Sequence, residues 1–179
     1  MAITPPSERI WWKEPVHKVE IIWIIVAFLW GVAMFFTMIW WHGFGQQNMS
    51  NEAYRIQPYQ FAEKVDAMIA AHTVRQEGAF PVVKPPPGSD VYLMGRVYMW
   101  WPMLELEKGK TYRLHLSSID LQHGFSLQPL NINIQVHPGY ESVMTITPTS
   151  SGEFGIVCNE YCGLGHHTMP GRIYVVDRT

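Results

Sequence analysis

Cys158-Asn-Glu-Tyr-Cys162-Gly-Leu-Gly-His166-His167-Thr-Met169 is the most informative stretch of this chain. It holds both cysteines, four positions apart, and a histidine and a methionine follow within eleven residues of the first cysteine. The stretch lies between two short β-type runs, which predicts a loop held in place by its neighbouring strands. Thiol, imidazole and thioether side chains on one such loop are typical of a metal site.

Three ordinary alternatives compete with a copper site. A disulfide between Cys158 and Cys162 is reasonable outside the cytoplasm, but it leaves His166 and Met169 without a role. Zinc sites use cysteine and histidine but not methionine. A c-type haem needs Cys-x-x-Cys-His, whereas here three residues separate the cysteines and no histidine follows Cys162 directly.

Copper suits this set of side chains better, because thiolate, imidazole and weak axial thioether are the ligands of electron-transfer copper sites. A mononuclear site uses one cysteine, whereas two thiolates on one loop can bridge two copper ions. Such a site needs a second histidine from elsewhere in the chain. His123, which follows a predicted strand, is the best candidate.

The apolar residues of the chain gather near its N-terminus. Ile21–Trp41 contains no charged residue over 21 positions, and about 20 apolar residues cross a bilayer. The run is too long for a signal peptide and ends without a small-residue cleavage site. Arg9, Lys13 and Lys18 precede it, and no Lys or Arg follows until Arg55, so the N-terminus is expected in the cytoplasm and the remainder outside.

The rest of the chain changes from helical to β-type patterns. Pro58 to about Arg75 has apolar residues at helical spacing, and Lys84-Pro-Pro-Pro-Gly88 interrupts regular structure. Short strands then alternate with turns, which predicts a β-sandwich or Greek-key barrel. The expected strands are Val91–Tyr98, Thr111–Leu116, Ile132–Val136, Ser142–Thr147, Phe154–Val157 and Arg172–Val176.

Composition limits the function classes. The chain has 179 residues, a net charge of -2 and 16% charged residues, which argues against a nucleic-acid-binding protein. The expected organisation is mainly β with one transmembrane helix. It comprises a cytoplasmic N-terminus (1–20), a transmembrane helix (21–42), a linker with a short helix (43–89) and a copper-binding β-domain (90–179).

The cysteine loop with His123 upstream resembles the dinuclear CuA site of subunit II of haem-copper oxidases. His123-Gly-Phe, Asn131-Ile-Asn-Ile, Pro138-Gly and Gly152-Glu-Phe extend the resemblance to the single-helix subunit II of B-type (ba3-like) cytochrome c oxidases. The resemblance implies a cupredoxin-like Greek-key barrel that carries CuA, a centre of two copper ions. It implies side-chain ligands and one backbone carbonyl, the latter from Glu160; the side chains are those of His123, Cys158, Cys162, His166 and Met169.

The resemblance also implies a function. The chain would take electrons from cytochrome c at CuA and pass them to haems in a large membrane subunit I, which reduces oxygen to water and pumps protons. The chain would be the electron-entry subunit of an oxidoreductase, with no catalytic residue of its own. A CuA subunit of a nitric oxide reductase remains an alternative, and a membrane-tethered cupredoxin or copper chaperone is a weaker one, because it would need only one cysteine.

Two further expectations come from the same family. Trp100 and Trp101 lie in an aromatic stretch that resembles the face where cytochrome c docks, and one of them is expected to serve electron entry; barrel core is the alternative role. Glu20, at the cytoplasmic edge of the membrane helix, corresponds to a glutamate at the mouth of a proton channel. An ordinary interfacial charge is the alternative for Glu20.

Overall fold

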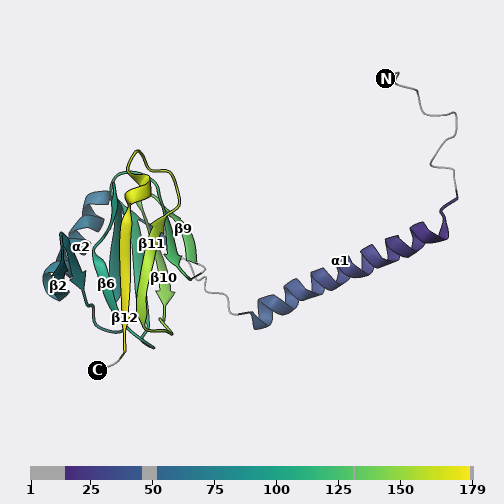
Figure 1. Cartoon of the computed structure of the whole chain (residues 1–179), viewed down its shortest axis with the longest axis horizontal. Coiled ribbons are helices and arrows are strands. Elements are labelled where there is room, and N and C mark those ends of the chain that lie inside the picture. The colour runs from purple at the N-terminus through teal and green to yellow at the C-terminus, as the bar shows by residue number, and fades with distance from the viewer. Residues whose placement is uncertain (1–14, 46–51, 131, 178–179) are drawn as a thin grey trace, which may run out of the picture. The chain divides into compact units, whose positions relative to one another are not determined.

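A computed structural model describes residues 15–45, 52–130 and 132–177 (Figure 1). The chain forms two compact units, Met1–Gln47 and Asn48–Thr179. In the first unit, helix α1 (Lys18–Phe44) has 27 residues, and every one of them is exposed. At 1.5 Å per residue the helix is about 40 Å long, so it is long and apolar enough to cross a membrane. Most of the expected cytoplasmic N-terminus (1–14) lies outside the described residues.

The second unit is a two-sheet β-domain whose described residues include the α-helix α2 (Pro58–His72). The five-stranded sheet has the order β1 (Glu52–Arg55), β10 (Tyr140–Ile146), β7 (Tyr112–Ser118), β4 (Asp90–Arg96), β5 (Met99–Trp101). The seven-stranded sheet has the order β2 (Thr73–Glu77), β3 (Phe80–Val83), β6 (Met103–Glu107), β12 (Pro170–Val176), β11 (Gly152–Cys158), β8 (His123–Gln128), β9 (Ile132–Val136). The predicted class, a mainly β fold after one N-terminal apolar helix, is confirmed.

Each of the predicted strand runs overlaps an observed strand, in chain order β4, β7, β9, β10, β11 and β12. The segment 43–89, expected to be a linker with a short helix, also contributes β1, β2 and β3 to the sheets. The predicted helix ends at His72, three residues early, because Thr73–Glu77 pairs with β3 as an edge strand. The sequences of β1, β2 and β3 show little alternation of apolar and polar residues. These strands therefore form because they pair with neighbouring strands, and their sequences alone do not predict them.

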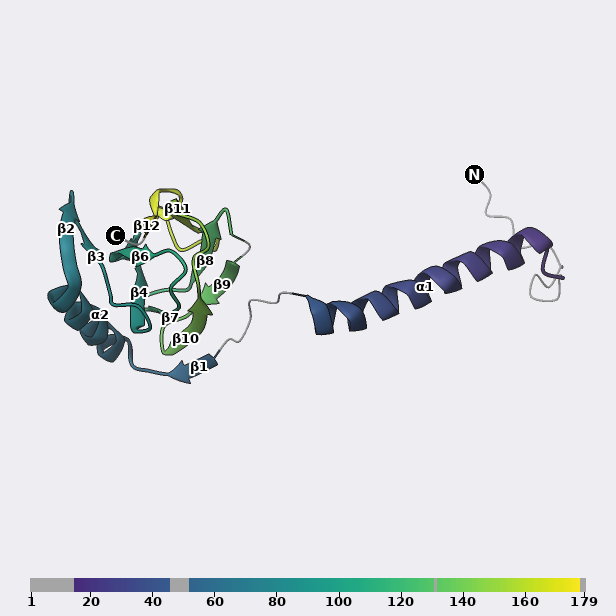
Figure 2. The ribbon, with the colours of Figure 1, turned by 90° about the horizontal axis from the view of Figure 1, so that it is seen from below.

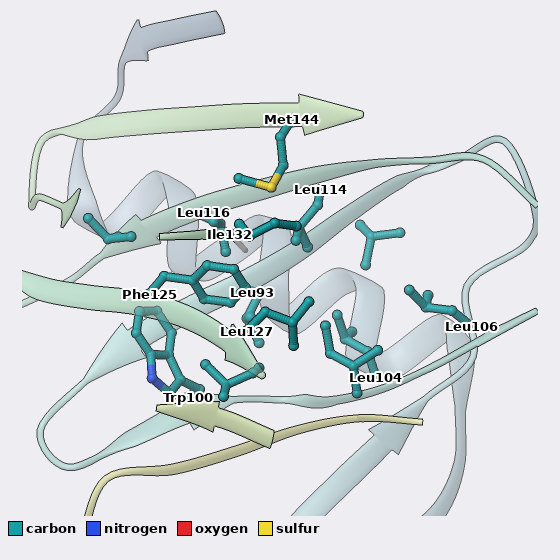
Figure 3. Close-up of a cluster of buried hydrophobic side chains, with 14 of the residues drawn as sticks. Leu93, Trp100, Leu104, Leu106, Leu114, Leu116, Phe125, Leu127, Ile132 and Met144 are labelled. Carbon is teal, nitrogen blue, oxygen red and sulfur yellow. The ribbon is translucent and has the colours of Figure 1, made fainter. Parts of the chain in front are cut away.

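The hydrophobic core lies between the two sheets (Figure 3). Leucines of β4, β6 and β7 meet the aromatic rings of Trp100 and Phe125, whose centroids lie 5.4 Å apart in an edge-to-face arrangement. Alternation along β12, where Ile173 and Val175 are buried and Arg172 is exposed, shows the period of two expected for a strand with one buried face. Packing of the core therefore determines which side chains of these strands point inward, including those next to the cysteine loop.

Helix α2 covers the outer face of the five-stranded sheet (Figure 2). Its Phe61, Val65 and Met68 are buried at i, i+4 and i+7 spacing, and Phe61 packs edge-to-face on Tyr92 of β4 with centroids 5.8 Å apart. Together with the core, the helix leaves His115 and Ser117 of β7 buried although both are polar. Polar side chains that lose their access to water in this way need protein partners.

One such polar cluster is centred on His115 of β7. Its Nδ1 lies 2.5 Å from Glu141 Oε1 and its Nε2 lies 3.0 Å from Asp90 Oδ1. Lys64 of α2 reaches the other oxygen of Glu141 at 3.2 Å. This network links helix α2 to the five-stranded sheet. His115 and Glu141 are only 6% and 5% exposed, so the loss of either partner would destabilise the folded domain.

Replacing Glu141 with alanine should destabilise the folded domain by about 1–3 kcal/mol, because it leaves Nδ1 of the buried His115 without its hydrogen-bond partner. Denaturant unfolding of the full chain in detergent, followed by tryptophan fluorescence, measures the change. Glu153→Ala is the control: its pair with Arg172 is exposed, and its loss should cost about 0–1 kcal/mol. Equal stabilities of the two variants would contradict the assignment.

Candidate metal centre

The loop between β11 and β12 gathers four sulfur and nitrogen donors at one end of the sandwich, where it is drawn in yellow in Figure 1. Cys158 Sγ lies 3.8 Å from Cys162 Sγ. Cys162 Sγ lies 3.7 Å from Nδ1 of His166, at the start of the short 3-10 helix η2 (His166–Thr168), and 3.9 Å from Met169 Sδ. Both cysteines and Met169 are buried, and His166 is half-buried.

The fifth side chain comes from the neighbouring strand. β8 pairs with β11, with Phe125 opposite Cys158, and this register brings the start of β8 beside the loop. His123 Nδ1 lies 3.9 Å from Cys158 Sγ, and its ring is fully buried. The nitrogen of His123 and the sulfurs of both cysteines lie within 4.8 Å of one another. The structure thus brings together residues that are 46 positions apart in the chain, from 123 to 169.

The backbone of the loop supplies another oxygen. The carbonyl of Glu160 accepts a hydrogen bond from the Cys158 thiol at 3.3 Å, so it faces the donors, while the Glu160 carboxylate accepts a hydrogen bond from Gln135 at 2.8 Å on the surface. Gly124 makes room for this turn: a Cβ there would lie 2.0 Å from the Asn159 side chain and 2.8 Å from the Glu160 nitrogen. The glycine after His123 therefore allows the loop to cross β8.

Tyr98 supports the other half of the loop. A Cβ at Gly165 would lie 2.4 Å from the Tyr98 ring, and one at Gly163 would lie 2.8 Å from its hydroxyl oxygen. Gly163 also has a φ of +123°, a conformation that side-chain-bearing residues rarely adopt. Both glycines of Cys-Gly-Leu-Gly-His are thus needed for the loop to lie flat on this tyrosine, between Cys162 and His166.

The two adjacent tryptophans point in opposite directions, as neighbours on a strand do. Trp100 is fully buried and meets the His123 ring edge-to-face with centroids 6.0 Å apart. Its indole Nε1 is the one buried side-chain nitrogen or oxygen without a hydrogen-bond partner in the described part of the chain. Trp101 is half-buried and lies on the outer face, with the Arg96 guanidinium 4.7 Å above its ring. Only Trp100 contacts the site.

Asp120 completes the surroundings of His123. Its Oδ1 lies 2.8 Å from His123 Nε2, the ring nitrogen that faces away from the cysteines. Burial alone would raise the pKa of Asp120, but hydrogen bonds from the Val97 amide, His123 and the Leu121 amide outweigh it and lower this pKa. The supporting roles of Asp120, Gly124 and Tyr98 were not predicted from the sequence. An Asp-x-x-His spacing was the available signal for the first.

The donor set suits a soft metal ion. The two thiols are free, and their 3.8 Å separation is far beyond a disulfide bond of about 2.05 Å. Burial raises the pKa of Cys162 to about 11, and the hydrogen bond and charge of Cys158 act in the same direction. Without a metal, Cys162 is therefore protonated at neutral pH, and a thiophilic cation has to displace its proton. Two sulfurs, two imidazole nitrogens, a thioether and a carbonyl fit copper.

Glu20 lies in the other unit, near the start of α1. Its Oε2 accepts a hydrogen bond of 2.9 Å from the His17 backbone N–H, which caps the first turn of the helix.

His167 follows the proposed ligand His166 in the sequence, and its side chain is exposed.

Comparison with known proteins shows the family of this chain. Residues 102–176 match the family model "Cytochrome C oxidase subunit II, periplasmic domain". Two cytochrome c oxidase subunit 2 proteins of Thermus thermophilus are 39% identical over 112 residues, or 59% of this chain; the match covers 83% and 67% of those proteins. A chain of a heme-copper terminal oxidase dimer has the same fold, with a TM-score of 0.59, 20% identity and coverage of 89% of this chain and 100% of that one. This protein belongs to the cytochrome c oxidase subunit II family.

Proposed function

We propose that this chain is the electron-entry subunit of a B-type (ba3-like) cytochrome c oxidase, and that it holds a dinuclear CuA centre. The observation that carries the proposal is the convergence of three further side-chain donors and one carbonyl on two buried, unbonded cysteine sulfurs. The B-type assignment is supported by the one candidate membrane helix among the described residues and by the similarity to the Thermus proteins.

The proposed ligands are His123, Cys158, the Glu160 carbonyl, Cys162, His166 and Met169. A copper pair held there would supply reversible one-electron oxidation and reduction. The chain's own part is to keep the donors still: β8 and β11 hold His123 and Cys158, and Tyr98 supports the turn between Cys162 and His166. Donors of this number leave no open position for a substrate, so the chemistry on oxygen belongs to the large haem-bearing subunit I.

The proposed placement is a single-pass membrane protein with a cytoplasmic N-terminus and the copper domain on the outer side. Lys18 and the basic residues before it support this orientation, as does the description of the matched family model as a periplasmic domain. Cytochrome c or a similar small haem protein is the proposed electron donor.

The full chain loaded with copper should bind two copper ions and be purple and mixed-valent, because two thiolates share both metals. Metal analysis and EPR measure the stoichiometry and the delocalisation of the unpaired electron. Cys158→Ser and Cys162→Ser should each abolish the dinuclear site, whereas Met169→Leu should retain both ions and shift the reduction potential, because an axial thioether is a weak ligand. One copper per wild-type chain with a localised EPR spectrum would refute the proposal.

We place electron entry at the exposed part of the cysteine loop. Tyr161 and Leu164 are 76% and 88% exposed, which is unusual for apolar side chains on an ordered loop, and the Tyr161 ring lies 5.9 Å from that of His166. Of the two tryptophans expected to serve electron entry, Trp100 lies closer to the site but is fully buried. It is therefore proposed to act behind the surface, against His123, and Trp101 is proposed to have no part in electron entry.

Leu164→Ser should slow the second-order reduction by cytochrome c about tenfold, since losing one buried leucine contact costs about 1.5 kcal/mol or more. Stopped-flow reduction of the oxidised site measures the rate. Leu130→Ser is the matched control, because Leu130 is also exposed but lies after the opposite end of β8. Trp100→Phe should slow reduction and Trp101→Phe should not. Equal rates for all four variants and wild type would exclude this entry surface.

Glu20 is proposed to collect protons for the large subunit at the cytoplasmic edge of α1. Glu20→Gln tests this role cleanly, because glutamine can still accept the hydrogen bond from the His17 amide but cannot carry a proton. In the assembled oxidase, this variant should lower steady-state turnover several-fold while reduction by cytochrome c stays at the wild-type rate. Unchanged turnover from neutral to alkaline pH would leave Glu20 with its capping role alone.

A further inference from the structure

The two proposed histidine ligands have very different surroundings. His166 is half-buried beside the exposed Tyr161, and the hydrogen bond found for its ring in the described part of the chain goes to Cys162. His123 has no exposed area, Trp100 lies against its ring, and its Nε2 meets the Asp120 carboxylate at 2.8 Å. The ring of His123 is therefore held in place by Trp100 and Asp120, whereas the ring of His166 has its hydrogen bond to Cys162 and is open to solvent on one side.

Asp120 is itself fixed by three further donors. Its Oδ1 accepts hydrogen bonds from the Leu121 amide at 2.6 Å and the Ser118 hydroxyl at 3.2 Å, and its Oδ2 accepts one from the Val97 amide at 2.7 Å. Val97 belongs to the turn between β4 and β5, directly before Tyr98. The carboxylate thus joins the loop after β7, the β4–β5 turn and the His123 ring, and it has little freedom to move.

This geometry decides where the imidazole carries its proton. The Leu121 amide, which can only donate, already points at Asp120 Oδ1, so this oxygen acts as an acceptor and His123 Nε2 has to be the protonated nitrogen. In the neutral ring the lone pair then lies on Nδ1, the atom that faces Cys158 Sγ. We propose that Asp120 is a positioning residue that fixes the tautomer and orientation of His123 for copper and lowers the reduction potential of the centre.

The second part of the proposal rests on the proposed copper function. A carboxylate bonded to the outer nitrogen of a metal-ligating histidine makes the ring a stronger donor. A stronger donor favours the more positively charged, oxidised state of the metal, and the nearby negative charge acts in the same direction. Since His166 has no such partner among the described residues, Asp120 makes the two histidines unequal.

The test uses two variants of the full chain in detergent. Asp120→Asn keeps an oxygen that can accept from Nε2 but removes the charge, and Asp120→Ala removes both. Asp177→Asn is the control, because Asp177 is an exposed carboxylate after the opposite end of β12, paired with Lys108 at 3.5 Å. Circular dichroism melts establish that each variant is folded.

Nitrogen-15 NMR of histidine in the metal-free chain reads the tautomer directly. His123 should be the Nε2–H form in wild type and in Asp120→Asn, and a mixture of tautomers in Asp120→Ala. With copper, Asp120→Ala should bind the metal about 10–100-fold more weakly. Asp120→Asn should have a more positive reduction potential than wild type, and Asp177→Asn should match wild type in all three measurements.

An Nδ1–H form of His123 in the wild-type metal-free chain would overturn the proposal, whether or not the alanine variant folds. So would wild-type copper affinity and potential in both Asp120 variants. Because the tautomer is measured without metal, failure of the copper proposal would appear separately, as a wild-type chain with the Nε2–H form of His123 that binds no copper pair.

Discussion

The structure depends on keeping two cysteine sulfurs close together without a bond between them. The two buried sulfurs lie 3.8 Å apart, and burial together with the nearby Cys158 raises the pKa of Cys162, because two thiolates so close would repel each other in a low-dielectric environment. A protein keeps such a pair only where a rigid frame brings other donors to the same point. Here β8 supplies a histidine from the neighbouring strand, and the turn after β11 supplies the rest. The sandwich, its core and the helix that covers its outer face together provide that frame.

The frame holds the site partly through residues that are not themselves proposed ligands. Tyr98 and Trp100 lie two positions apart on one β-hairpin, yet Tyr98 supports the glycine turn before His166 and Trp100 supports His123. Asp120 bonds to the backbone of the same hairpin and to His123. A substitution in this hairpin therefore reaches both halves of the donor set, although none of its residues is a proposed ligand.

The sequence predicted the donors well because cysteine, histidine and methionine are few and chemically distinctive. It also predicted six of the strands and the apolar helix near the N-terminus. It did not predict β1, β2, β3 and β5, which are short and depend on their partners in the sheet, nor β6 and β8, which lie among turn residues and the predicted site. Nor did it distinguish Trp100 from Trp101. Adjacent residues of a strand face opposite sides of the sheet, but the sequence does not indicate which of the two sides faces the core. Asp120 was missed because its role follows from the path of a loop.

The unequal exposure of the two histidines bears on how the site is assembled. His123 is sealed beneath Trp100 and Asp120, whereas His166 reaches solvent beside Tyr161 and Leu164. Under the proposed function we therefore expect copper ions and electrons to reach the site from the same exposed side, so that a single substitution at Tyr161 or Leu164 would affect both assembly and turnover.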